Sequence, residues 1–217
     1  MKYKNKDGDR VLIKNYAQKY ENQVLDLWNK CCVFDAIDVR KFRKQALFDE
    51  NFDVELAWIA VNEEDQVKGF IYGIKRKFPY LERGLEADRG WINVIFVDPE
   101  FRKRGIGQDL YVKVETLFKE KGVKNITLGA YSPNYFFWGL DPDHYREAVK
   151  FFEKNGYYSV DMHYSMGKNL HGYQIPEITL KKKQDAQRKG YTFKTFDYAD
   201  ALEVLQFLHD EFGAGWK

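Results

Sequence analysis

Residues 97–108 hold the densest set of groups that can do chemistry, in the order V-D-P-E-F-R-K-R-G-I-G-Q. Two glycines, Gly105 and Gly107, stand where an amphipathic segment begins, and three cationic side chains precede them: Arg102, Lys103 and Arg104. The first turn of a helix carries backbone N–H groups without an intrahelical partner, at the positive end of the helix dipole. Glycine lets an anion approach those groups closely. The segment therefore predicts a phosphate-binding turn.

Two common phosphate-binding patterns do not fit this turn. A mononucleotide P-loop has Lys and then Ser or Thr after its last glycine, whereas Gln108 follows Gly107 here. A dinucleotide-binding turn has a third glycine three residues after Gly107, where this chain has Leu110. The remaining pattern is R-x-x-G-x-G, formed by Arg102, Gly105 and Gly107. It follows a segment that ends in Val-Asp-Pro.

The elements on both sides must position this turn. Residues 91–97 (WINVIFV) predict a strand that Asp98-Pro99 ends. Residues 105–121 predict an amphipathic helix, which Gly122 terminates, and residues 125–130 predict another strand. A strand, a helix and a strand in this order imply a parallel pair with a right-handed connection.

Other segments extend the sheet and its helical cover. Residues 55–61 and 67–74 predict an antiparallel hairpin across the polar turn 62–66. The other expected elements are a strand at 11–13, helices at 20–32 and 38–47 (the second capped by Asp38), a helix at 141–154 and a strand or hairpin at 157–166. Together they predict an α/β fold, with a mixed, twisted sheet (an antiparallel hairpin plus a parallel pair) and helices on both faces.

Composition narrows the class of protein. The chain has 217 residues, 35 Lys+Arg against 33 Asp+Glu, a net charge of +2 and 17% aromatic residues. The aromatics predict a packed core, and the charge balance gives no basic field for nucleic acid. No apolar run approaches the roughly 20 residues that cross a bilayer, and residues 1–10 hold no apolar signal core. The two cysteines, Cys31 and Cys32, are adjacent, which argues against a disulfide framework or a thiolate metal site. We expect a reduced, cytoplasmic protein with no metal and no nucleic-acid or membrane partner.

The segment after residue 170 differs from the rest. Residues 171–190 contain three consecutive lysines but no long apolar run, and they predict a linker or a solvated strand-turn rather than a nucleic-acid patch. Residues 191–196 predict a strand and residues 199–212 predict a helix. This pair either repeats the pattern of the first strand and helix of the chain or is an amphipathic unit that resembles it by coincidence. So short a unit cannot bury its own core. Its apolar face is expected to dock on the first domain or to exchange into a second chain, giving a homodimer.

The spacing of Arg102, Gly105 and Gly107 resembles the V-x-P…R-x-x-G-x-G signature of the GNAT-family N-acetyltransferases. A second match, Ala148-x-x-Phe151-Phe152-Glu153-Lys154-x-Gly156-Tyr157, is similar to the last helix and following strand of that family. The resemblance covers most of residues 8–168, and with the tail the chain resembles the first half of a tandem GNAT protein. It implies an acetyl-coenzyme A-binding domain at 1–170, an incomplete second unit at 171–217, and acetyl transfer to a primary amine.

The resemblance also implies a site for the acyl donor. The strand edge formed by Ile95, Phe96 and Val97 would meet the pantetheine arm and the thioester carbonyl. The pyrophosphate would lie on Arg102, Lys103, Arg104, Gly105, Ile106, Gly107 and Gln108. To admit the arm, the strand at 91–97 must splay from its parallel neighbour at 125–130, so that free backbone groups pair with the amides of the donor.

The catalytic residues of the family match poorly. The tyrosine that often protonates the leaving sulfur corresponds to Phe152, and the nearest phenol, Tyr145, would either replace it or only line the cleft. The carboxylate that often acts as base corresponds to Trp91. Asp88 lies nearby, as a base or as a loop residue, and Asn93 cannot act as a base. An acetyltransferase and a non-catalytic acyl-coenzyme A-binding module are therefore both carried forward, with a nucleotide-phosphate binder as a third hypothesis. The amine-bearing acceptor is a small molecule or a protein.

The aromatic-rich segment 131–142 allows two interpretations. It is either a wall of the acceptor or cofactor pocket or a satellite core under a long loop. The four histidines have no metal-ligand spacing, so structural or surface roles are expected for His144, His163, His171 and His209.

Overall fold

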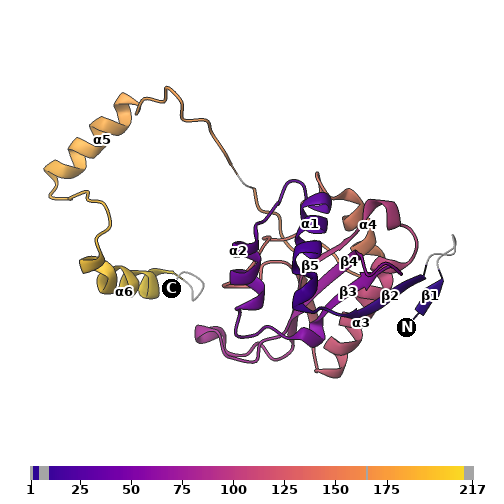
Figure 1. The fold of residues 1–217 in the computed structure, drawn as a ribbon. Helices are drawn as coiled ribbons and strands as arrows, with labels where there is room; N and C mark the ends of the chain where they lie inside the picture. The colour runs from indigo at the N-terminus through magenta and orange to yellow at the C-terminus, as the bar shows by residue number, and fades with distance from the viewer. Residues whose placement is uncertain (1, 5–9, 165, 213–217) are drawn as a thin grey trace. The chain divides into compact units, whose positions relative to one another are not determined.

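The computed structural model describes residues 2–4, 10–164 and 166–212 (Figure 1). The chain divides into two compact units, Met1–Phe151 and Phe152–Lys217, and each is described by itself. The first unit holds a mixed sheet whose strands lie side by side in chain order. These strands are β1 (Lys2–Lys4), β2 (Arg10–Asn15), β3 (Ala57–Val61), β4 (Val67–Ile74), β5 (Arg89–Val97) and β6 (Asn125–Leu128).

Strand pairing confirms the predicted hairpin and the predicted parallel pair. β1 to β5 pair antiparallel, and β5 pairs with β6 in parallel. The crossover between β5 and β6 is the predicted helix, α3 (Ile106–Glu120). The short edge strand β1 has no counterpart in the sequence prediction, because three residues of strand give no measurable alternation.

Helices cover both faces of the sheet, as predicted. On one face lie α1 (Glu21–Cys31), α2 (Val39–Phe42) and its π-helical continuation η2 (Arg43–Leu47), with the Asp38 side chain capping α2 at Lys41 N. There Trp28 of α1 packs against the ring of Phe96 in β5, at 5.7 Å between centroids. On the other face of the sheet, α3 packs closely against glycines of the strands. A Cβ at Gly73 would lie 2.7 Å from Val114 Cγ1, so this glycine lets the helix approach β4 closely.

Short helical turns and the later helices complete the described chain. These are η1 (Gln18–Tyr20), η3 (Val54–Leu56), η4 (Leu81–Arg83), η5 (Pro99–Phe101), α4 (Arg146–Lys154), α5 (Glu177–Arg188), η6 (Tyr198–Asp200) and α6 (Ala201–Glu211). The helix predicted from residue 141 begins only at Arg146. The Asp141 carboxylate accepts the backbone N–H groups of Asp143 and His144, at 2.8 and 3.1 Å, and this local turn competes with the helix.

Three expectations for the second unit are wrong. Among residues 157–164 and 166 the structure has no strand, since Tyr158 and Val160 are 80% and 84% exposed and no neighbouring strand satisfies the backbone. The predicted linker contains helix α5, whose Lys, Gln and Ala residues form helix well without an apolar face. Residues 191–196 form no strand, although α6 follows as predicted. The division at residue 170 stays a prediction.

No helix among the described residues combines the length and the apolar character needed to span a bilayer.

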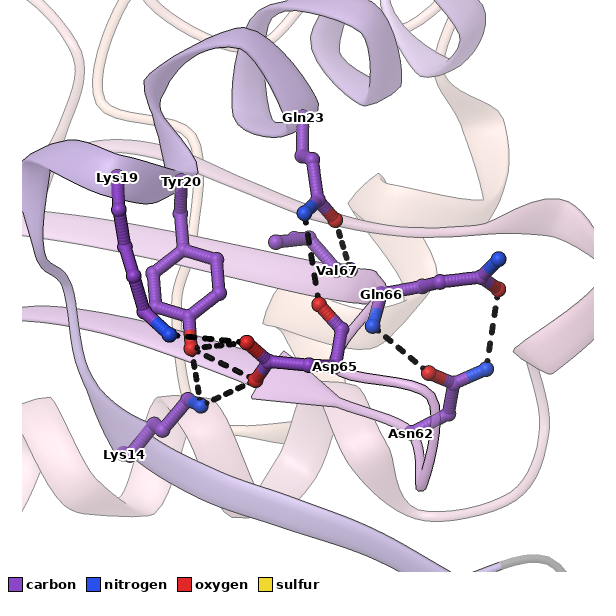
Figure 2. Close-up of polar contacts among 8 residues, drawn as sticks. All are labelled: Lys14, Lys19, Tyr20, Gln23, Asn62, Asp65, Gln66 and Val67. Carbon is purple, nitrogen blue, oxygen red and sulfur yellow. Dashed lines mark hydrogen bonds and ion pairs between the residues drawn. The ribbon is translucent and has the colours of Figure 1, made fainter.

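A polar cluster ties the start of α1 to the hairpin between β3 and β4 (Figure 2). The Asp65 carboxylate, in the hairpin turn, contacts Lys14 Nζ at 2.6 Å, Lys19 Nζ at 2.9 Å and the Tyr20 hydroxyl at 2.7 Å. Gln23 adds a second tie, because its Oε1 accepts Val67 N–H at 2.8 Å. The partners Lys14, Tyr20 and Lys19 together lower the pKa of Asp65.

We predict that the Asp65→Asn variant is less stable than the wild type at neutral pH. Asn tolerates the positive φ of 58° at this position, so the backbone is preserved while the charge is lost. Because the pKa of Asp65 is lower in the folded state, its contribution is present above the unfolded value of about 3.9 and disappears as the pH falls further. Thermal unfolding at several pH values measures this. A difference in Tm that is as large in acid as at pH 7 would contradict the assignment.

Candidate functional site

One edge of β5 is free along half of the strand. β6 pairs with β5 only from Arg89↔Asn125 to Ile92↔Leu128. The next residues of that chain, Gly129 and Ala130, have positive φ values of 62° and 52° and turn the chain away from the sheet. A Cβ at Gly129 would meet the Phe137 carbonyl oxygen at 2.7 Å, so glycine is required there. Residues 93–97 therefore have no strand beside them on the β6 side, within the described chain.

A β-bulge marks the point where this free edge begins. Tyr72 pairs with Val94 and Gly73 with Ile92, so Asn93 is the extra residue on β5. A bulge increases the local twist of a strand and turns its edge, which helps β5 to diverge from β6. Asn93 is 2% exposed, and neither its Oδ1 nor its Nδ2 has a hydrogen-bond partner among the described residues.

The other end of the free edge leads into the predicted phosphate turn. Asp98 caps η5 through Glu100 N–H, and its carboxylate contacts Lys30 Nζ at 2.8 Å. Burial alone would raise the pKa of Asp98, but the Lys30 ammonium, the Glu100 N–H and Lys68 together lower it. The buried Asp98 carboxylate thus remains charged and fixes the geometry of the turn.

Glycine opens the helix start as predicted. Gly105, the N-cap of α3, has a φ of 89°, and no side-chain cap covers the first-turn amides. A Cβ built at Gly105 would have Asp109 Oδ2, at 3.9 Å, as its nearest neighbour, so there is space beside Gly105 at the helix start. Gly107 lies against the end of β5, where a Cβ would be 3.6 Å from Val97 Cγ2. The amides of Ile106, Gly107 and Gln108 thus begin where the free edge of β5 ends.

The three cationic side chains of the turn make different contacts. Arg102 Nε donates to the Val97 carbonyl at 3.0 Å, which ties the turn to the strand. The Arg104 guanidinium lies 5.0 Å from the centre of the Phe101 ring. Lys103 Nζ contacts Glu147 Oε2 at 2.6 Å, and Lys103, with Lys150, lowers the pKa of Glu147 to about 2. An incoming phosphate would compete with Glu147 for Lys103.

Tyr145 lies just before α4 and bonds to the loop after α1. Its hydroxyl donates to Asp35 Oδ2 at 2.7 Å, and Phe34 stacks on His144 at 3.8 Å beside it. Burial and then the hydrogen bond to Asp35 raise the pKa of Tyr145. A phenol whose proton is held by a carboxylate is a weak proton donor to sulfur. This geometry favours the cleft-lining hypothesis for Tyr145.

The other candidates for proton transfer lie where they have structural roles. Trp91 is buried, and so is Phe152 on α4. The Asp88 carbonyl accepts hydrogen bonds from the N–H groups of Lys124 and Asn125 at the start of β6. Asp88 therefore stabilises this loop. Within the described part of the chain, no group of three or more His, Cys, Asp or Glu side chains is arranged to hold a metal ion.

A buried polar network next to Trp91 has no counterpart in the sequence prediction. The Asp49 carboxylate, just after η2, accepts Asn51 N–H at 2.7 Å and the Tyr131 hydroxyl at 3.3 Å. The Tyr131 ring packs against Trp91 at 5.3 Å and against the Arg76 guanidinium at 4.7 Å. Asp49, Arg76 and Tyr131 are far apart in sequence, and of these three only Tyr131 lies in a segment that the sequence singled out.

The aromatic-rich segment contributes mainly to the core. Tyr131 and Phe136 are buried in the main cluster, and Phe137 stacks on Trp28 at 5.8 Å. Trp138, in contrast, is exposed and packs on Tyr135. The segment therefore anchors the turn that opens the edge of β5.

Comparison with protein families matches residues 21–157 to the acetyltransferase (GNAT) family. A search of curated protein sequences returned no match. Similar solved structures include the GCN5-related glucosamine N-acetyltransferase region of a fungal multi-domain GH3 β-N-acetylglucosaminidase, at 20% identity and a TM-score of 0.66, over 92% of this chain and 23% of that one. A transcriptional regulator from Bacillus halodurans C-125 has 19% identity and a TM-score of 0.51, over 73% and 99% of the two chains. An aminoglycoside acetyltransferase from an uncultured soil metagenomic sample, in complex with trehalose, has 18% identity and a TM-score of 0.50, over 73% and 97%. At these identities the structures share the fold alone.

We predict that Tyr145→Phe lowers the free energy of unfolding by about 1–2 kcal/mol, because the Asp35 carboxylate loses its donor. Tyr135→Phe is the matched control, since no hydrogen bond of the Tyr135 hydroxyl exists within the described residues. Urea unfolding of both variants with an unchanged m-value provides the measurement. Equal effects of the two substitutions would show that the Tyr145–Asp35 bond contributes nothing.

Proposed function

Because the chain belongs to the acetyltransferase (GNAT) family, we propose that it transfers an acetyl group from acetyl-coenzyme A to a primary amine. The observation that carries this proposal is the continuity of two features: the free edge of β5 at residues 93–97 and the uncapped helix start at residues 105–108. The edge has no neighbouring strand and offers its backbone groups to an extended amide chain, apart from the Val97 carbonyl, to which Arg102 Nε donates. The helix start offers N–H groups to a diphosphate.

The residues of the turn fit a diphosphate on structural grounds. Gly105 leaves the first-turn amides of α3 open, and the positive end of the helix dipole points there. Lys103 and Arg102 add cationic groups on the same turn. Exchange of the Lys103–Glu147 contact for a Lys103–phosphate contact keeps this ammonium paired in both states.

The free edge would bind the rest of the donor. From Asn93 to Val97 an extended strand rises about 13 Å, so several amides of an extended arm can pair along it. The acyl end then lies toward Asn93 and Trp91, away from the turn. Acetyl-coenzyme A supplies the activated acyl group. Backbone N–H groups at the edge stabilise the negative charge that develops on the thioester oxygen.

In the transfer step a neutral amine attacks the thioester carbon, a C–N bond forms and the C–S bond breaks. One proton leaves the nitrogen, and the sulfur leaves as thiolate and takes up a proton. The buried Phe152 has no proton to give, and the Tyr145 proton is held by Asp35. Water that follows the acceptor into the cleft therefore carries the proton to sulfur in this proposal.

The second candidate function is the binding of acyl-coenzyme A without transfer of the acyl group. Trp91 and Phe152 stand where the resemblance expects a base and an acid, and neither side chain can do that chemistry. A module that binds acyl-coenzyme A without transferring the group would need only the turn and the edge. Turnover therefore has to be measured directly.

The test is thiol release from acetyl-coenzyme A with a panel of primary amines: glucosamine, an aminoglycoside, putrescine and a peptide with a free N-terminus. We expect release that depends on at least one amine and exceeds hydrolysis. Tight binding of coenzyme A without release across the panel would instead support the binding module. A thermal shift with ATP and NAD but not with coenzyme A would overturn both.

We predict that Gly105→Glu weakens the binding of coenzyme A about 10- to 100-fold, from a like-charge repulsion of about 1–3 kcal/mol. Gly122→Glu, just beyond the opposite end of α3, is the control. It has a comparable φ of 77°, open space around its Cβ and the same charge change. Calorimetric titration of both variants measures the difference. Equal affinities would show that the helix start does not hold the diphosphate.

A further inference from the structure

Buried polar atoms without partners gather around the bulge between β4 and β5. Within the described residues they include the Tyr72 hydroxyl, Arg76 Nη1 and both amide atoms of Asn93. All three side chains are at least nine-tenths buried. A buried polar group without a partner costs free energy, so its persistence in a native fold calls for an explanation. One explanation is a ligand that supplies the missing partners.

Asp49 lies in the same place and is a buried carboxylate with neutral partners only. The residue is 6% exposed. Its Oδ1 accepts Asn51 N–H at 2.7 Å and the Tyr131 hydroxyl at 3.3 Å, and its Oδ2 accepts Asn134 Nδ2 at 2.7 Å. Within the described chain no cation forms an ion pair with it. A buried charge is costly unless it is paired, and three hydrogen bonds offset only part of that cost.

Asp49, Arg76 and Trp91 adjoin one another through Tyr131. The Tyr131 hydroxyl reaches Asp49, and its ring lies 4.7 Å from the Arg76 guanidinium. Tyr72 and Tyr131 are both buried in the main core cluster. Asn93 follows Trp91 by two residues on β5, and Trp91 packs on Tyr131 at 5.3 Å.

Asp49 has no ion-pair partner among the described residues, whereas the other charged groups of this region pair with one another. Arg76 Nε contacts Glu86 Oε2 at 2.9 Å, and Arg89 Nε lies 4.0 Å from Glu86 Oε1. The region also lies at the Asn93 end of the free edge, where the acyl group of the donor is placed in the proposed function. A cation that enters there would meet Asp49.

We propose that Asp49 binds the primary ammonium group of the acceptor, and that Tyr131 and Asn134 hold the Asp49 carboxylate in place. The bound nitrogen then gives one proton to water and attacks as the neutral amine. This inference rests on the proposed function and names the residue that selects the acceptor. A primary ammonium has three N–H donors in a compact charge, which suits one carboxylate oxygen pair and a nearby phenol oxygen. Entry of the acceptor has to displace whatever side chains bury these atoms.

The direct probe is ethylammonium chloride, the smallest cation of this class, added to the protein with coenzyme A. At equal ionic strength, we expect ethylammonium to raise the Tm of the wild type above the value in tetramethylammonium chloride, which has no N–H donor. Asp49→Asn is expected to abolish this difference while the Kd for coenzyme A stays within about twofold, since Asp49 does not lie on the phosphate turn. Glu50→Gln removes the same charge from the exposed neighbouring residue and is expected to behave as the wild type.

Kinetics with the amine that the panel identifies provide a second readout. We expect Asp49→Asn to raise the KM for that amine about 10- to 100-fold, as for the loss of one charge-assisted hydrogen bond, with a smaller change in kcat. If this variant folds poorly, Asp49→Glu decides, because it keeps the charge and moves it by one methylene. It should retain the ethylammonium effect and still raise the KM.

The role of Asp49 and the transferase function are tested by different outcomes. An ethylammonium effect that survives in Asp49→Asn, or an unchanged KM in both Asp49 variants, would overturn the role of Asp49. Absence of thiol release from the wild type with every amine would overturn the proposed transferase function, whereas the Tm measurement would still decide whether Asp49 binds an ammonium ion.

Discussion

The candidate site depends on the early end of one strand pairing. β5 is bonded along its length to β4, but β6 leaves it after Ile92 because Gly129 and Ala130 adopt left-handed backbone conformations. Buried aromatic side chains hold this turn, above all Tyr131 and Phe136. Without the divergence, β5 would be an ordinary interior strand with no backbone groups to offer. The cost of the strained turn is thus tied to the free edge it creates.

Charge placement connects this edge to the turn that follows it. Asp98 is held by Lys30, and Arg102 is bonded to the Val97 carbonyl, so the last residues of β5 and the first residues of the turn form one rigid connection. The Lys103–Glu147 pair is on the surface and exchangeable. A fixed backbone with exchangeable side chains is suited to an anion that must be released after each turnover.

Features that neighbouring residues encode could be predicted from the sequence, whereas contacts between residues far apart in the chain could not. Residues 91–121 follow their pattern because strand, glycine turn and amphipathic helix are encoded by neighbouring residues. The network of Asp49, Arg76 and Tyr131 joins segments far apart in the chain, so no spacing reveals it. The strands expected at 157–166 and 191–196 failed because alternation supplies an apolar face but cannot supply the partner strand.

Amide hydrogen exchange with and without coenzyme A tests the central claim most directly. If the edge of β5 and the start of α3 bind the acyl donor, two sets of amides exchange more slowly when coenzyme A is present: those of residues 106–108, and those of residues 93–97 that point away from β4. The hairpin turn at residues 62–66 provides the internal reference and should not change. Protection elsewhere in the chain, with the amides of the edge and of the helix start unaffected, would contradict the account.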